Sequence, residues 1–193
     1  MTDWLLPPLQ VISVLEALEM PYVIGGSVAT LVHGVPRLTN DADIVVDFEL
    51  DKLESFVAAV EHDFYVEREA IRQAIKRRGS FNLLHYKTMF KVDMFLPKDR
   101  SFDRAQLSRR ILRVLSSEPP RKVYVLTAED NIVAKLEWFR MGGEVSQQQW
   151  RDVLGILKTK LKELDTDYMS AAAESLDVSD LLTLAIEAAR KED

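Results

Sequence analysis

The stretch that most constrains this chain is residues 22–47, YVIGGSVATLVHGVPRLTNDADIVVD. Its first three residues are apolar and predict a short strand, which ends at the pair Gly25-Gly26. Ser27 then opens an apolar-periodic segment that predicts a short helix. The first backbone N–H groups of a helix have no partners within it, so a turn of this kind is suited to binding a phosphate group.

Two carboxylates follow at the beginning of the next predicted strand, residues 44–46. Asp41 and Asp43 are separated by one residue, so on an extended backbone both side chains face the same side, near the glycine turn. Adjacent carboxylates repel each other unless a cation lies between them, and carboxylate and phosphate oxygens are usual ligands of magnesium. A Gly-Gly turn or an Asp-x-Asp sequence alone is also common in ordinary loops, so the indication comes from their combination.

A third carboxylate stands in a later apolar segment, residues 90–96, FKVDMFL, which predicts another strand. Asp93 is the only acid in that segment. An isolated carboxylate on a buried strand is costly, so Asp93 is expected to have a partner or a metal ion.

These features, in this order, resemble the signature of the nucleotidyltransferase superfamily that includes DNA polymerase β. The resemblance implies an α/β (α+β) fold with a mixed sheet and flanking helices. It also implies an enzyme that moves an NMP from an NTP to a hydroxyl group with the help of two Mg²⁺ ions. The catalytic and metal-binding residues that it implies are Asp41, Asp43 and Asp93, and the nucleotide-binding residues are Gly25, Gly26 and Ser27.

The resemblance extends to residues 129–136, EDNIVAKL, and 151–153, RDV, which look like the C-terminal motifs of AbiEii-type nucleotidyltransferases. It implies that Lys135 reaches the active site and that the later Arg-Asp pair supports it. Arg37 is the first basic residue after the glycine turn, and with Lys135 it is expected to neutralise phosphate charge. A lysine on an amphipathic helix is also often just its solvated edge. The AbiEii resemblance further implies a toxin of a toxin–antitoxin system, with an antitoxin protein as a possible partner.

The composition narrows the classes of protein without choosing among their activities. The chain has 193 residues and no cysteine, which excludes disulfides and thiolate metal sites and suits a cytoplasmic protein. No apolar run approaches the length of a membrane span, and the N-terminus does not resemble a signal peptide.

The net charge of −6 conceals a strongly basic segment. Residues 68–113 contain 13 Lys and Arg against 4 acids, a balance of +9. Such a segment could attract a polyanion to a site near Asp93. The alternative is that Arg68, Arg72 and Lys76 form one solvated face of a helix.

The pattern of predicted elements changes at Thr127. Residues 1–126 alternate predicted strands and helices, although 97–109 are polar and carry no predicted element. Thr127-Ala128-Glu129-Asp130 has the form of a capping box, and Ser146 can cap the next helix. We therefore expect a nucleotidyltransferase domain at 1–126 and a C-terminal helical domain at 127–193.

The acceptor is left open by the sequence. The basic segment favours an RNA end, such as that of tRNA. A second hypothesis is an antibiotic-modifying adenylyltransferase, whose pocket for a cationic drug should be rich in acids. A third is a module that binds nucleotide without turnover, for instance the antidote of a toxin–antitoxin pair. The three acids argue against this last hypothesis, because a module that only binds has no need to keep them together.

Overall fold

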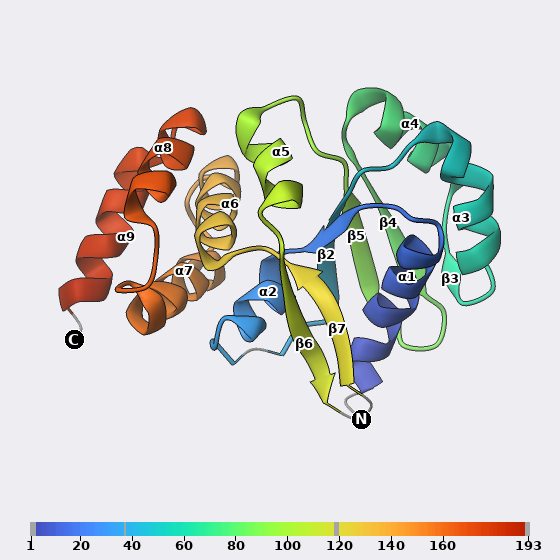
Figure 1. The fold of residues 1–193 in the computed structure, drawn as a ribbon, viewed down its shortest axis with the longest axis horizontal. Helices are drawn as coiled ribbons and strands as arrows, with labels where there is room; N and C mark the ends of the chain where they lie inside the picture. Colours follow the sequence, from blue (N-terminus) through green and yellow to red (C-terminus); the bar gives the residue numbers. More distant parts are fainter. Residues whose placement is uncertain (1–2, 37, 118–119, 192–193) are drawn as a thin grey trace.

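The computed structural model describes residues 3–36, 38–117 and 120–191, and within these residues it contains one seven-stranded mixed sheet (Figure 1). In chain order the strands are β1 (Tyr22–Ile24), β2 (Asp41–Val46), β3 (Phe64–Tyr65), β4 (Ser80–His85), β5 (Lys91–Phe95), β6 (Ile111–Ser117) and β7 (Pro120–Val125). Their order across the sheet is β3-β4-β5-β2-β1-β7-β6. The mixed α/β fold expected from the sequence is therefore confirmed.

The strand that carries the Asp-x-Asp sequence lies at the centre of the sheet. Strand β2 pairs in antiparallel fashion with β1 and in parallel fashion with β5. In the pairing of β2 with β5, Asp43 lies directly opposite Asp93. The register therefore places the third carboxylate beside the first two, on the same face of the sheet.

The opposite face of the sheet carries the main hydrophobic core. Alternation along the strands turns Ile44 and Met94 to this face, where both are fully buried. The face is covered by three helices, α1 (Leu6–Ala17), α3 (Leu53–Val60) and α4 (Arg68–Arg77), with 3₁₀ turns at Asp3–Leu5 and Leu50–Lys52. Burying the apolar residues on one face leaves the other free for polar side chains.

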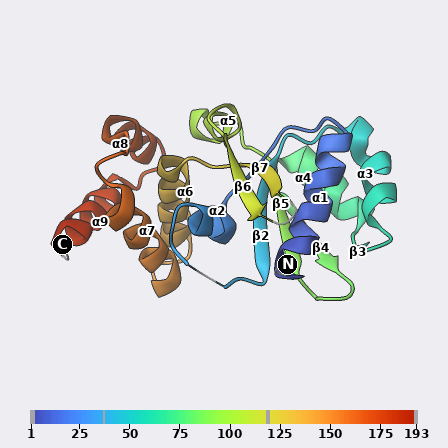
Figure 2. The same cartoon turned by 60° about the horizontal axis from the view of Figure 1, so that its bottom comes forward.

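A second hydrophobic core lies in the helical region that follows the sheet. Its helices are α6 (Ala128–Met141), α7 (Gln147–Lys160), α8 (Thr166–Ser175) and α9 (Ser179–Lys191). Thr127 and Ser146 cap α6 and α7 as expected, by accepting hydrogen bonds from the backbone N–H groups of Asp130 and Gln149. Both views place α8 and α9 at the end of the molecule opposite α3, with α6 nearest the sheet (Figures 1 and 2). The division into domains at residue 127 stays a prediction.

One helix was not expected from the sequence. Helix α5 (Ser101–Ser108) lies within the polar stretch 97–109. Its buried residues are Phe102 and Gln106, one turn apart, so its inner face carries one large apolar side chain and one amide. That pattern is too weak to indicate a helix. Phe102 packs in the second core although it precedes residue 127. No helix in the described ranges is long and apolar enough to cross a membrane.

Candidate active site

The glycine turn after β1 packs directly against the first pair of carboxylates. The backbone N–H of Gly25 donates to the carbonyl of Asp43 at 2.8 Å. Gly26 has φ +54°, and a Cβ added to it would lie 1.7 Å from Asp43 Oδ2. Only glycine combines this backbone conformation with this close approach. The Gly-Gly pair is therefore what allows Asp43 to lie beside the turn.

A chain of hydrogen bonds ties this turn to the helical region. Helix α2 (Gly26–Val32) begins at the turn, and Ser27 in its first turn is buried and lines the cleft described below. The hydroxyl of Thr30 donates to the Gly26 carbonyl at 2.8 Å, and Asn131 Nδ2 donates to Thr30 Oγ1 at 3.0 Å. Asn131 thus fixes the turn from α6, a structural part that the sequence motif did not reveal.

Three carboxylates and one ammonium group share the face of the sheet next to the turn. Asp43 lies opposite Asp93, and Asp41 lies opposite Lys91, on neighbouring strands β2 and β5. Lys91 Nζ is 2.7 Å from Asp93 Oδ2. The hydroxyl of Thr39 donates to Asp41 Oδ1 at 2.5 Å. The hydrogen bond to Asp93, and then the negative field of all three acids, raise the pKa of Lys91.

Crowding and burial disfavour the charged form of Asp43. Its pKa rises from 3.8 to about 6, mainly through burial and then through the neighbouring charges of Asp41 and Asp93. The positive charges of Lys135 and Lys91 oppose this rise in the pKa. An acid that is costly to ionise beside two others is a feature of functional sites and of cation sites.

The structure offers a metal ion two suitable carboxylates, whereas the sequence resemblance implies three. Among the described residues, no group of three or more His, Cys, Asp or Glu is arranged to hold a metal ion. Asp41 and Asp43 fit a divalent cation, because they are hard oxygen donors on one face and repel each other. Asp93 is already paired with Lys91. The role of Asp93 as a metal ligand and the number of ions thus stay predictions.

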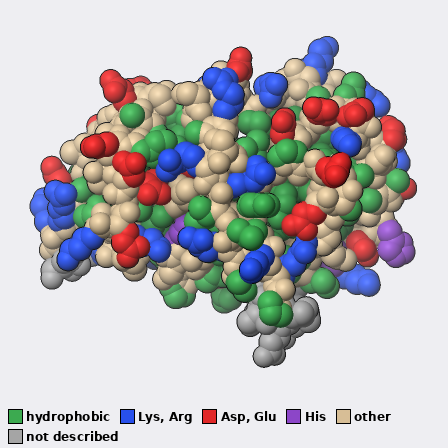
Figure 3. All heavy atoms as spheres, in the orientation of Figure 1, with side chains coloured by type: hydrophobic (Ala, Val, Ile, Leu, Met, Phe, Trp, Pro, Cys, Tyr) green, Lys and Arg blue, Asp and Glu red, His purple; other side chains and the backbone are tan. Residues whose placement is uncertain are grey.

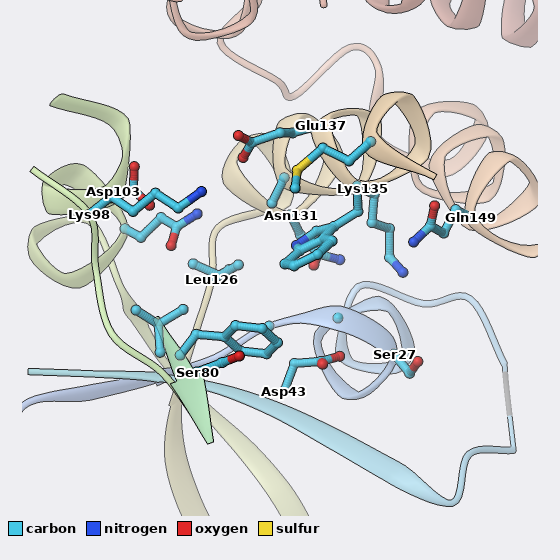
Figure 4. Close-up of a pocket in the computed structure, with 18 of the residues that line it drawn as sticks. Ser27, Asp43, Ser80, Lys98, Asp103, Leu126, Asn131, Lys135, Glu137 and Gln149 are labelled. Atoms are coloured by element: carbon cyan, nitrogen blue, oxygen red, sulfur yellow. The ribbon is translucent and has the colours of Figure 1, made fainter. Parts of the chain in front are cut away.

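Lys135 faces Asp43 from α6, on the other side of the cleft (Figure 4). It is buried, and its Nζ donates to Asp152 Oδ2 on α7 at 2.8 Å. Gln148 donates to the other oxygen of Asp152 at 3.0 Å. The lysine is therefore no solvated helix edge. Of the predicted Arg-Asp pair, Asp152 is therefore the residue that contacts the lysine. Among the described residues, the hydrogen bonds found for Arg151 stay within α7, where it donates to the Gln147 carbonyl and to the side chain of Gln148.

A cleft of about 600 Å³ runs between the sheet and α6. Its inner end contains the glycine turn, Asp41, Asp43 and Lys135. Its middle is lined by Phe95 on β5 and Trp138 on α6. The two rings pack edge to face, with their centroids 5.6 Å apart. The cleft thus joins a charged end to an aromatic wall.

The outer end of the cleft is lined by charged side chains from the β4–β5 side and from α5 and α6. Arg100 is ion-paired with Asp103 and with Glu137, whose Oε1 is 2.5 Å from Arg100 Nη1. Figure 4 shows Lys98 beside Asp103, reaching toward the cavity. Arg78 donates to the Pro97 carbonyl at 3.1 Å and also lines the cleft. No ion pair of Arg78 or Lys98 is found among the described residues, so both contribute positive charge to this end.

The structure brings most of the sequence-predicted residues into one place. Lining the cleft together are Gly25, Gly26, Ser27, Asp41, Asp43 and Lys135. Asp93 lies beside Asp43 in the sheet register. Arg37, the remaining predicted nucleotide-binding residue, lies outside the described residues. The roles of these residues in binding and catalysis remain predictions.

The basic helix does not face this cleft. Helix α4 packs on the opposite, apolar face of the sheet through Ile71 and Ala74. Its Arg68 and Arg72 form ion pairs with the exposed acids Glu54, Glu61 and Glu69. On the face shown in Figure 3, acidic and basic side chains are interspersed. The solvated-face interpretation therefore fits Arg68 and Arg72, whereas other cations of the segment reach the cleft.

Comparison with solved structures identifies the fold. A nucleotidyltransferase-like protein from Paracoccidioides brasiliensis matches with a TM-score of 0.55 and 21% identity, over 96% of this chain and 93% of that chain. The antibiotic-resistance factor ANT(2'')-Ia matches with a TM-score of 0.53 and 14% identity, over 95% of this chain and 92% of that chain. No protein-family model matches the sequence, and a comparison with curated proteins finds no significant match. The chain has the nucleotidyltransferase fold, and the finer AbiEii resemblance stays a prediction.

Removing the charge of Asp43 should stabilise the metal-free protein. Because folding raises the pKa of this carboxyl to about 6, the folded chain keeps a proton that the unfolded chain releases between about pH 4 and 6. This group therefore lowers the free energy of unfolding as the pH rises through that window. Asp43→Asn should remove this dependence and raise the free energy of unfolding at pH 7 by on the order of 3 kcal/mol.

Urea denaturation in the presence of a chelator, repeated from pH 4 to pH 8, measures this effect. Asp47→Asn, in an exposed position just after the same strand, is the matched control and should leave the curve unchanged. Equal behaviour of the two variants would contradict the crowded-carboxylate description.

Proposed function

We propose that this protein is a nucleotidyltransferase that moves an NMP from an NTP to a hydroxyl acceptor. The observation that supports it best is the meeting of Asp41, Asp43 and Asp93 on one face of the sheet, against a glycine turn. The fold shared with nucleotidyltransferase-like proteins supports the same activity. Lys135 adds a buried positive charge across the cleft.

The chain's own residues suggest how the triphosphate of the nucleotide is held. The backbone N–H groups of Gly26 and Ser27, at the start of α2, are available to the triphosphate. Lys135 offsets negative charge that develops on the phosphates during transfer. A divalent cation such as Mg²⁺, held by Asp41 and Asp43, would supply further neutralisation of the phosphates.

We propose that Asp93, which lies beside Asp43 in the sheet, acts on the acceptor. Its carboxylate can accept the hydrogen bond of an acceptor hydroxyl and take its proton as the oxygen attacks the α-phosphate. The new bond joins that oxygen to the α-phosphorus, and the bond to the leaving pyrophosphate breaks. The products are a nucleotidylated acceptor and pyrophosphate.

The outer end of the cleft favours an acceptor that carries phosphate, such as an RNA end. Arg100 is paired with both Asp103 and Glu137, whereas no ion pair of Arg78 and Lys98 is found among the described residues, so these five side chains together carry a net charge of +1. Two such cations at a cleft mouth attract phosphate and make binding sensitive to salt. The toxin role, the antitoxin partner and the cytoplasmic location are extensions of this proposal that rest on the AbiEii resemblance and the lack of cysteine.

The first test follows the labelled nucleotide. Each α-labelled NTP is incubated with Mg²⁺ and either total tRNA or the small-molecule fraction of a lysate. We expect label to appear on RNA with the parent protein and to fall at least 100-fold with Asp43→Asn, because the charge next to the glycine turn is lost. Asp47→Asn should label as well as the parent. Transfer that persists in Asp43→Asn would show that other residues do the chemistry, and label confined to small molecules would overturn the RNA acceptor.

The second test separates the two groups of cations in the basic segment. The double variant Arg78→Glu, Lys98→Glu should weaken RNA labelling at least tenfold at low salt and flatten its dependence on salt concentration. Arg68→Glu, Arg72→Glu makes the same change of charge on the far face of the sheet and serves as the matched control. Equal losses in the two double variants would mean that only the overall charge matters, and no loss in either would point to an uncharged acceptor.

A further inference from the structure

We propose that Lys91 is a built-in counter-ion of Asp93, so that the site binds one divalent cation, at Asp41 and Asp43, rather than two. This inference rests on the proposed function and concerns the same site. It differs from the two-ion expectation drawn from the sequence resemblance.

The geometry places the ammonium group of Lys91 within the acidic cluster. Lys91 and Asp93 are two residues apart on β5, so their side chains share one face of the sheet. The register sets Lys91 opposite Asp41 and sets Asp93 opposite Asp43. The distance of 2.7 Å between Lys91 Nζ and Asp93 Oδ2 is that of a charge-assisted hydrogen bond. The alternation of side chains along β5 therefore sets Lys91 next to the third carboxylate.

The balance of charge agrees with a single divalent cation. On the sheet, three ionised carboxylates and one ammonium group leave a net charge of −2, which one divalent cation neutralises, and Lys135 across the cleft is already paired with Asp152. A second divalent cation at Asp93 would lie beside the ammonium group and be repelled by it. It would also have to replace a hydrogen bond that the strand geometry already provides.

The pairing leaves Asp93 able to serve the acceptor. Lys91 occupies Oδ2, and no partner of Oδ1 is found among the described residues. An ammonium group on one oxygen favours the ionised carboxylate and fixes its orientation, while the other oxygen can accept a hydrogen bond from a hydroxyl group. Lys91 is then a positioning residue for the proton acceptor.

The competing possibility is that a divalent cation displaces Lys91. The side chain of Lys91 is 45% exposed, so it can swing into solvent at little cost. Asp93 would then become a metal ligand, and the site would take two ions. The number of bound ions distinguishes these two arrangements.

The test counts bound Mn²⁺ on the full chain by electron paramagnetic resonance, in the presence of each of four non-hydrolysable NTP analogues. We expect the analogue that binds to bring one Mn²⁺ per parent chain and two per Lys91→Met chain, because that variant leaves Asp93 without its ammonium partner. Lys91→Arg keeps the charge and should bind one. Lys87→Met removes an exposed lysine from the neighbouring turn and should also bind one.

Two Mn²⁺ ions on the parent chain would overturn the inference while leaving the proposed function intact. One ion on Lys91→Met would also overturn it, since the ammonium would then not be what excludes the second ion. No bound Mn²⁺ with any of the four analogues would overturn both the inference and the proposed function. Two ions on the parent or on Lys91→Arg would overturn the inference even if Lys91→Met fails to fold.

Discussion

The close approach of Asp43 to the glycine turn is the contact on which the rest of the site depends. Any side chain at Gly26 would overlap the Asp43 carboxylate, and the positive φ at this position suits glycine. The same turn begins α2. The Gly26 carbonyl accepts a hydrogen bond from the Thr30 hydroxyl, which in turn accepts one from Asn131 on α6. One glycine thus brings together the sheet, the start of α2 and the helical region.

The second constraint is the cost of gathering acids in one place. Three carboxylates lie next to each other, and burial adds to the penalty at Asp43, whose pKa rises to about 6. The protein offsets part of this cost with Lys91 on the sheet and with Lys135, which Asp152 holds from α7. Such strain is common at functional sites, where stability is given up for reactivity. The helical region is therefore needed for more than packing, because it supplies the opposing charge.

Much of this arrangement could be predicted from the sequence because its signals are local. Apolar strands, a glycine pair and an i, i+2 pair of acids predicted β1, α2 and β2 in order, and the single acid among apolar residues predicted that Asp93 would lie on a strand. The caps at Thr127 and Ser146 were also local signals. The same i, i+2 geometry shows in hindsight that Lys91 shares a face with Asp93.

The remaining features depend on tertiary contacts that no local pattern encodes. The charge of a segment does not tell on which face of the sheet each side chain lies. It therefore could not show that Arg68 is on the far face while Lys98 lines the cleft. Helix α5 was missed because its buried face carries an amide next to Phe102. The bond from Asn131 to Thr30 spans 101 residues and follows only from the docking of α6.

The most direct test of the central claim is the location of a bound nucleotide. A crystal structure with Mn²⁺ and a non-hydrolysable NTP, with anomalous scattering to identify the metal, would show it. We expect the triphosphate on the N–H groups of Gly26 and Ser27, with the manganese signal between the Asp41 and Asp43 carboxylates and Lys135 facing the phosphates. A nucleotide bound away from the glycine turn, or a metal ion bound elsewhere on the chain, would contradict the proposed active site.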